Sequence, residues 1–250
     1  FGARRARAAA TDAGAEAVSE GEARTALVLG AAGGVGREAV KALRASGWRV
    51  RAAVRTDAKR GDVPLVGADG DVEAVVVDVT KYETLPPALA GVDAIVVAVG
   101  TTDFTDPLGP YKNEYVGTKN VVAAARNAAA PGAGPKVVLV TSIGTEDPFF
   151  NPLNLAWGIL FWKQRAEEEL QRSGLRYTIV RPGGLSNDAV PGAAVLKPRG
   201  EARTGRVSRA EVARVCVEAI DLPEAEGKVV ELVQDEGAAE AEMAVQFAAI

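Results

Sequence analysis

Short apolar runs recur along the chain, separated by longer segments of mixed polarity. Runs rich in Val, Ile, Leu and Ala predict β-strands at residues 26–29, 50–54, 73–78, 93–99, 136–140, 176–180 and 228–233. These runs are continuous rather than alternating, which is typical of strands buried on both faces of a sheet. Because helical segments separate successive strands, the pattern predicts an α/β fold with a doubly wound parallel sheet of about seven strands.

The segments between the strands carry the helix signals. Helices are predicted after Gly36, near Lys81, at 111–128 and 155–173, and in an acidic stretch after the last strand. Ser208 and Glu211 form a capping box that opens a further helix to about Ile220. Since no linker or internal repeat interrupts this series, residues 25–250 are predicted to form a single domain.

The segment before the first strand has a different character. Residues 1–24 are rich in Ala, carry Arg4, Arg5 and Arg7 together, and show no apolar period. They are predicted to form a flexible leader outside the fold. A processed transit-peptide remnant, an ordinary disordered leader and an arm that packs on a partner all fit this composition.

The first strand runs directly into Gly30, Gly33 and Gly36, at the spacing G-x-x-G-x-x-G. Glycines allow a sharp turn and a close approach of the backbone to a pyrophosphate, and the following helix N-terminus offers free N–H groups. The strand–turn–helix–strand context therefore predicts a Rossmann dinucleotide-binding turn. The other residues of the turn expected to contact the cofactor are Ala32, Gly34 and Val35.

Ligands of such sheets bind outside the carboxyl ends of the strands. Arg55 ends the second strand, where it suits a 2′-phosphate and favours NADP(H) over NAD(H). Asp78 would lie beside the adenine, or cap the helix near Lys81, and the two roles are compatible. Ser142 is either close to the nicotinamide or a cap or turn residue. The remaining candidate cofactor-binding residues at strand ends are Val79, Val99, Gly100, Thr141, Pro182 and Gly183.

Composition narrows the chemistry. The 250 residues include no histidine and a single cysteine, Cys216. This excludes a serine–histidine triad, an internal disulfide and a thiolate metal cluster, and no metal site is predicted. The net charge of −4 gives no electrostatic case for nucleic-acid binding. No apolar run is long enough to span a bilayer.

From about Thr25 to Val233 the sequence resembles the atypical short-chain dehydrogenase/reductases. The motifs that carry the resemblance are the glycine turn, Arg55, Asp78, GTKN at 117–120, TSIG at 141–144 and YTIVRPGG at 177–184. The segment NPLNLAWG at 151–158, with Trp162-Lys163 and Ala166-Glu167, resembles a narrower group. That group comprises plant and cyanobacterial proteins related to the redox-sensing, dehydrogenase-like component of the chloroplast inner-envelope translocon.

The resemblance implies NADP(H) binding, with Arg55 at the 2′-phosphate and Asp78 and Val79 at the adenine. Enzymes of the wider family use a Ser, a Tyr and a Lys that lies four residues beyond the Tyr. The Tyr acts as acid/base on the substrate oxygen. Ser142 matches the Ser, and Lys163 matches the Lys that also holds the nicotinamide ribose.

Two positions depart from the family pattern. Ile159 stands at the Tyr position, and Glu114 stands where extended members carry an Asn. Tyr111 and Tyr115 are nearby in sequence but on a different predicted helix. Efficient carbonyl reduction is therefore not expected.

Residues 155–162 (LAWGILFW) are apolar all round and are followed by a strongly charged continuation. Such a turn should be buried on two sides. The segment is interpreted as core plus an oligomer or protein-partner contact, in preference to a substrate pocket plugged by Trp157 and Ile159.

These observations lead to one functional hypothesis and two rivals. The chain is expected to be an NADP(H)-binding, dehydrogenase-like protein that serves as a redox-responsive or structural subunit of a chloroplast complex. It would lie in the stroma or at the thylakoid or envelope surface, where peripheral membrane association would be open to it. The first rival is an active NADPH-dependent reductase of a small apolar carbonyl or quinone, with water or Tyr115 replacing the missing Tyr. The second is an assembly factor in which the nucleotide only stabilises the fold.

Overall fold

The computed structural model describes residues 24–67, 70–101, 103, 105–128, 134–147, 154, 157–202 and 204–250. The strands are β1 (Thr25–Leu29), β2 (Arg49–Val54), β3 (Val72–Val76), β4 (Ala94–Val97), β5 (Lys136–Val140), β6 (Tyr177–Pro182), β7 (Gly184–Ser186), β8 (Ala193–Pro198), β9 (Arg206–Ser208) and β10 (Lys228–Asp235). The α-helices are α1 (Gly34–Ala45), α2 (Leu85–Leu89), α3 (Gly117–Ala128), α4 (Ile159–Gln171), α5 (Arg209–Asp221) and α6 (Met243–Ala248). Shorter helical turns are η1 (Asp57–Asp62), η2 (Tyr82–Thr84), η3 (Tyr111–Val116) and η6 (Pro223–Ala225).

All strands belong to one sheet, in the order β3-β2-β1-β4-β5-β6-β10-β9-β7, with β8 also paired to β10. Every neighbouring pair from β3 to β10 is parallel. The strand order reverses direction between β1 and β4, which is the switch point of a doubly wound sheet. The predicted α/β Rossmann architecture is therefore confirmed.

The sheet has ten strands rather than about seven. The strands that the sequence did not predict are β7, β8 and β9. β7 and β9 have only three residues each, too few to produce an apolar run. They join the sheet with β8 because β10 offers an antiparallel edge to β8 and β9, and β9 pairs in turn with β7. The expectation of a single strand after Gly184 was thus wrong.

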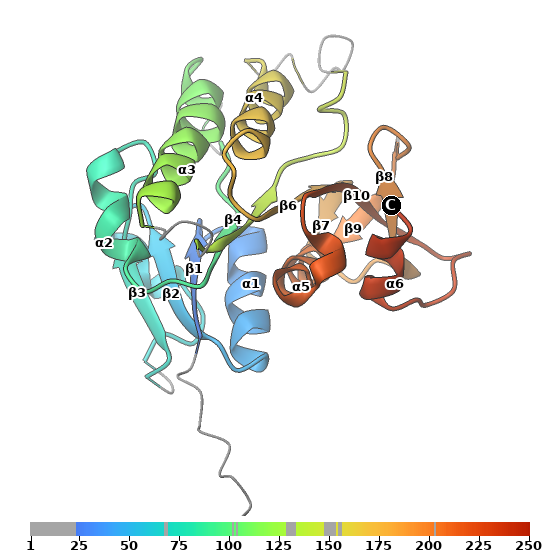
Figure 1. Ribbon diagram of the computed structural model, residues 1–250, viewed down its shortest axis with the longest axis horizontal. Helices are drawn as coiled ribbons and strands as arrows, with labels where there is room; N and C mark the ends of the chain where they lie inside the picture. The colour runs from blue at the N-terminus through green and yellow to red at the C-terminus, as the bar shows by residue number, and fades with distance from the viewer. Residues whose placement is uncertain are drawn as a thin grey trace, which may run out of the picture.

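Helices cover both faces of the sheet (Figure 1). On one face α1, α5 and α6 pack through residues such as Leu43, Cys216 and Phe247, all fully buried. On the other face α2, α3 and α4 pack through Leu85, Val121 and Leu170. The nearly continuous burial of β1, β4 and β5 follows from this double cover.

Three predicted helices differ from the observed ones. The helix expected in the acidic stretch after the last strand is wrong in its placement, because α6 covers only Met243–Ala248, which contains no acidic residue. The segment 111–128 is helical throughout, but its first part, η3, is a π-helix. The helix expected at 155–173 begins only at Ile159, because Gly158 has the left-handed conformation with φ of 73°. Residues 155 and 156 lie outside the described residues. Ser208 caps α5 as expected, its Oγ accepting from the Glu211 N–H at 3.2 Å.

Residues 1–23 of the predicted leader lie outside the described residues. Arg24, its last residue, donates to both carboxylate oxygens of Asp221 at 2.5 and 3.0 Å. Its guanidinium also lies 4.0 Å from the centre of the Trp48 ring. Arg24 thereby ties the start of β1 to the end of α5.

The buried thiol of Cys216 gives a direct test of this packing. The side chain is fully buried in α5, and burial raises the pKa of the thiol to about 12. A thiolate is the reactive form, so a disulfide reagent at pH 8 should label the native protein only at the rate of unfolding. One equivalent should be labelled at once in denaturant. Rapid labelling of the native protein would contradict the packing of α5 against the sheet and beside α1.

Candidate functional site

The glycine turn lies at the switch point of the sheet. Gly30 follows β1 with φ of 84°, a conformation that favours glycine. A Cβ on Gly30 would lie 2.6 Å from the carbonyl oxygen of Ala98, and one on Gly36 would overlap the carbonyl oxygen of Gly30. Gly33 N–H donates to the Gly30 carbonyl at 2.9 Å. Backbone packing therefore requires glycine at 30 and 36, and α1 begins immediately beside the end of β1.

The N-terminus of α1 is open to an anion. Its N-cap is Gly33, which offers no side-chain cap, and no acidic residue occupies its first turn. Gly33 and Gly34 are exposed, whereas Val35 and Gly36 are buried. Free N–H groups and the positive end of the helix dipole together favour a phosphate at this position. The turn thus fits the pyrophosphate of a dinucleotide.

Arg55 directly follows β2 and is exposed. Among the described residues, no carboxylate lies within ion-pair distance of it. The acid nearest in sequence, Asp57, is paired with Arg60 at 2.6 Å. The end of β2 therefore presents a cation that is available to an anionic group of a ligand.

At the end of β3, Asp78 closes a turn. Its Oδ1 accepts from the N–H of Thr80 at 3.0 Å and from its hydroxyl at 2.7 Å. The predicted role as a helix cap is therefore wrong, since η2 begins later with Lys81 at its N-cap position. The next residue, Val79, is buried and lies 2.7 Å from where a Cβ on Gly117 would be.

One departure from the family pattern, Glu114, contacts the family lysine position near the end of β4. Glu114 on η3 is 3% exposed, and its Oε2 lies 2.7 Å from Nζ of Lys163 on α4. Its Oε1 accepts from the N–H of Thr101 at 2.8 Å. Gly100 is adjacent, because a Cβ there would lie 3.8 Å from the same Oε1. Lys163 is thus held in a mostly buried ion pair, which the sequence did not predict.

Tyr115 does not replace the missing phenol in an activated form. Ile159 is the first residue of α4, one turn before Lys163. Tyr115 donates its hydroxyl to Glu169 at 3.0 Å. This hydrogen bond, with burial, raises the pKa of Tyr115 above its ordinary value, the opposite of what an acid/base tyrosine needs. Tyr111 packs edge-on against Trp162, with ring centres 4.9 Å apart.

Beyond β5, Thr141 and Ser142 make different contacts. Ser142 is half-buried and its hydroxyl donates to the carbonyl of Ile143 at 3.1 Å. Thr141 is buried and donates to Glu167 at 2.6 Å. Pro182 and Gly183 are buried at the end of β6. These residues line up with Gly30 and Gly100 at the carboxyl edge of the sheet.

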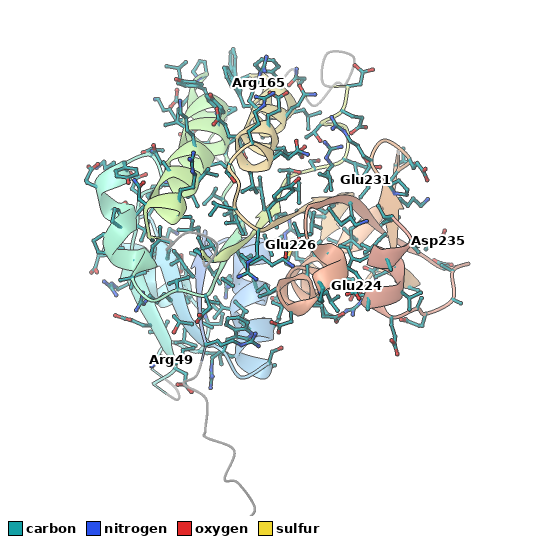
Figure 2. The ribbon with its side chains drawn as sticks, in the orientation of Figure 1. Arg49, Arg165, Glu224, Glu226, Glu231 and Asp235 are labelled. Atoms are coloured by element: carbon teal, nitrogen blue, oxygen red, sulfur yellow. The ribbon has the colours of Figure 1, made fainter. Side chains whose placement is uncertain are left out.

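A buried charge cluster underlies this edge. Arg181 is fully buried and donates to Glu167 through Nε at 3.0 Å and Nη2 at 2.6 Å. Its Nη1 contacts Glu146 at 3.0 Å and the fully buried Glu231 of β10 (Figure 2) at 3.6 Å. The sequence pattern predicts that Arg181 ends a strand, and it predicts no charged partner for it. The signal was present, because Arg181 and Glu231 each interrupt an apolar run, and the two runs pair with these residues directly opposite.

The apolar segment 155–162 is only partly buried. Residues 155 and 156 lie outside the described residues, and Trp157 is 49% exposed, so the predicted burial on two sides is wrong there. Leu160 is fully buried. Phe161 and Trp162 line a surface hollow of about 280 Å³ together with Tyr115 and charged residues of α4. One of these, Arg165, points outward from α4 (Figure 2).

Within the described part of the chain, no helix is long and apolar enough to cross a membrane. The same residues contain no cluster of acidic or sulfur side chains that could hold a metal ion.

The fold and the glycine turn together define a Rossmann dinucleotide-binding domain. Residues 30–223 match the family model described as NAD(P)H-binding. The chain belongs to this family, as an atypical short-chain dehydrogenase/reductase close to the TIC 62 group.

Individual relatives show how far the likeness extends. The chain is 39% identical over 176 residues to the chloroplastic protein TIC 62 of Arabidopsis thaliana, a match that covers 64% of this chain and 27% of that protein. It is 31% identical over 260 residues to sanguinarine reductase of Eschscholzia californica, covering 87% and 92% respectively. A solved structure of a putative NAD-dependent epimerase/dehydratase from Bacillus halodurans is 29% identical with a TM-score of 0.76, covering 91% and 100%. The chain thus spans about a quarter of the length of TIC 62 but most of the other two.

The charge cluster generates a stability prediction. Arg181→Met leaves Glu167 and Glu231 buried without their cation, so the free energy of unfolding should fall by about 3–5 kcal/mol. The control is Arg172→Met, because Arg172 is exposed and pairs with Glu168 at 3.4 Å; its loss should cost less than about 1 kcal/mol. Urea unfolding measures both. Equal losses for the two variants would show that the cluster does not anchor the sheet edge.

Proposed function

We propose that the chain binds NADP(H) at the glycine turn and acts as a redox-responsive or structural subunit of a chloroplast complex, without efficient turnover. The observation that carries this proposal is the ion pair of Lys163 with Glu114, together with Ile159 at the Tyr position. Lys163 is bound to a buried carboxylate, and the position from which a tyrosine would receive its help is occupied by Ile159. Similarity to TIC 62, whose name places it in the chloroplast, supports the location.

Each cofactor-binding role is part of this proposal. The residues proposed to contact the dinucleotide are Gly30, Ala32, Gly33, Gly34, Val35, Gly36, Arg55, Asp78, Val79, Val99, Gly100, Thr141, Ser142, Lys163, Pro182 and Gly183. Bound NADPH would supply a hydride at the nicotinamide. The exposed aromatic surface around Trp157 and Trp162 is proposed as the contact for a protein partner or a second copy, and peripheral membrane attachment would act through such a partner.

A second candidate function is an NADPH-dependent reductase of a small apolar carbonyl or quinone. The observation that favours it is the similarity to sanguinarine reductase, which extends over 92% of that protein. In that case the reaction would proceed without a tyrosine, since Tyr115 is bound to Glu169.

Cofactor preference tests the role of Arg55. The protein should bind NADPH more tightly than NADH, and Arg55→Gln should weaken NADPH binding by about tenfold or more, because a charge-assisted contact with the 2′-phosphate is lost. NADH binding should not change. Arg49→Gln, at the opposite end of β2 (Figure 2), serves as the charge-matched control. Cofactor fluorescence titration measures the affinities of the unmodified protein and both variants for each nucleotide, and equal weakening of NADH would exclude a 2′-phosphate role for Arg55.

Turnover separates the two functions. With NADPH bound and quinones or small aldehydes offered, the absorbance at about 340 nm should persist for hours. Ile159→Tyr alone should remain inactive, because Glu114 still holds Lys163, whereas Ile159→Tyr with Glu114→Asn should gain carbonyl reduction. Catalytic loss of absorbance in the unmodified protein would establish the reductase instead.

A further inference from the structure

Arg209 lies against the glycine turn although it is far from it in sequence. It is the first residue of α5, directly after the N-cap Ser208. Its Cδ and Nε lie 2.5 Å from where a Cβ on Gly34 would be, so its side chain fills the space that a side chain at position 34 would occupy. Gly30 and Gly36 are required by backbone packing, whereas Gly34 makes room for Arg209.

The position of the guanidinium relates it to the free N–H groups of α1. Cα–Cβ bonds of a helix tilt toward its N-terminus. Gly34 is the first residue of α1, so a group at its Cβ position lies beside the open N-terminal end of that helix. The Arg209 side chain is therefore within reach of an anion held by those N–H groups.

This is an unfavourable place for a cation in the absence of an anion. Arg209 lies at the N-termini of both α1 and α5, where helix dipoles favour negative charge. Its one hydrogen bond within the described residues is from Nη1 to the neutral Oδ1 of Asn187, at 2.7 Å. No carboxylate of the described residues lies within ion-pair distance of it. An anionic ligand bound beside Arg209 would offset this unfavourable interaction between the guanidinium and the two helix dipoles.

We propose that Arg209 is a phosphate-binding residue of the dinucleotide site, which holds the pyrophosphate together with the N–H groups of the glycine turn. This inference rests on the proposed binding of NADP(H) and adds a residue from α5, the helix that packs beside α1 on the same face of the sheet. Asn187, the residue directly after β7, positions the guanidinium.

Both nucleotides carry the pyrophosphate, and this decides the experiment. Arg209→Gln should weaken NADPH and NADH by the same factor, about tenfold or more. Arg209→Lys keeps the charge but not the planar fork, and should fall between. The control is Arg126→Gln, an exposed arginine in the last turn of α3 at the opposite edge of the sheet. It changes the net charge equally and should leave both affinities unchanged.

Thermal unfolding distinguishes a residue that contacts the ligand from one that only stabilises the fold. Because the cation opposes two helix dipoles, Arg209→Gln should leave the melting temperature of the ligand-free protein unchanged or higher, and should shrink the rise produced by saturating NADPH. Unchanged affinities, weakening confined to NADPH, or a lower melting temperature with an undiminished ligand-induced rise would each overturn the assignment. If the unmodified protein binds neither nucleotide, the proposed function itself fails; if it binds both and Arg209→Gln binds them equally well, only this inference fails.

Discussion

The close approach of backbone to backbone at Gly30 and Gly36 is the constraint on which the rest of the site depends. No atom larger than hydrogen fits on Gly36, because the carbonyl oxygen of Gly30 occupies that space. The approach sets the height at which α1 begins above β1 and brings its first N–H groups to the gap between β1 and β4. It also fixes the face of α1 that packs against α5. The position of Arg209 over Gly34 follows from that packing.

The carboxyl edge of the sheet is held by charges as well as by apolar packing. Arg181 joins β6, α4 and β10 through Glu167 and Glu231, and Lys163 joins α4 to η3 through Glu114. Ions in such surroundings are tolerated only when they are paired and hydrogen-bonded. The same elements that would position a nicotinamide are thus fixed relative to one another by ion pairs. A lysine used in this way supports the fold, whichever ligand is bound.

The parallel core of this fold could be predicted from the sequence alone, because continuous apolar runs and a glycine-rich turn are local signals. It missed β7 to β9, which are short and exist through pairing with β10 or with each other. It placed the start of α4 too early because the left-handed backbone at Trp157 and Gly158 has no clear signal in the apolar pattern. The roles of Glu114, Arg181 and Arg209 depend on partners that are distant in sequence. Of the site, the turn and the strand ends were therefore predictable, and the charged contacts were not.

The placement of β10 has a consequence for how the protein is made. It is the last strand in sequence order, yet it lies inside the sheet, between β6 on one side and β8 and β9 on the other. Until β10 has left the ribosome, β6 presents a row of unpaired backbone groups, and Arg181 lacks its partner Glu231. Such an open edge is a template for pairing with another chain. Nascent chains that stop before Lys228 should therefore be prone to aggregation and dependent on chaperones, even though most of the Rossmann core has already been synthesised.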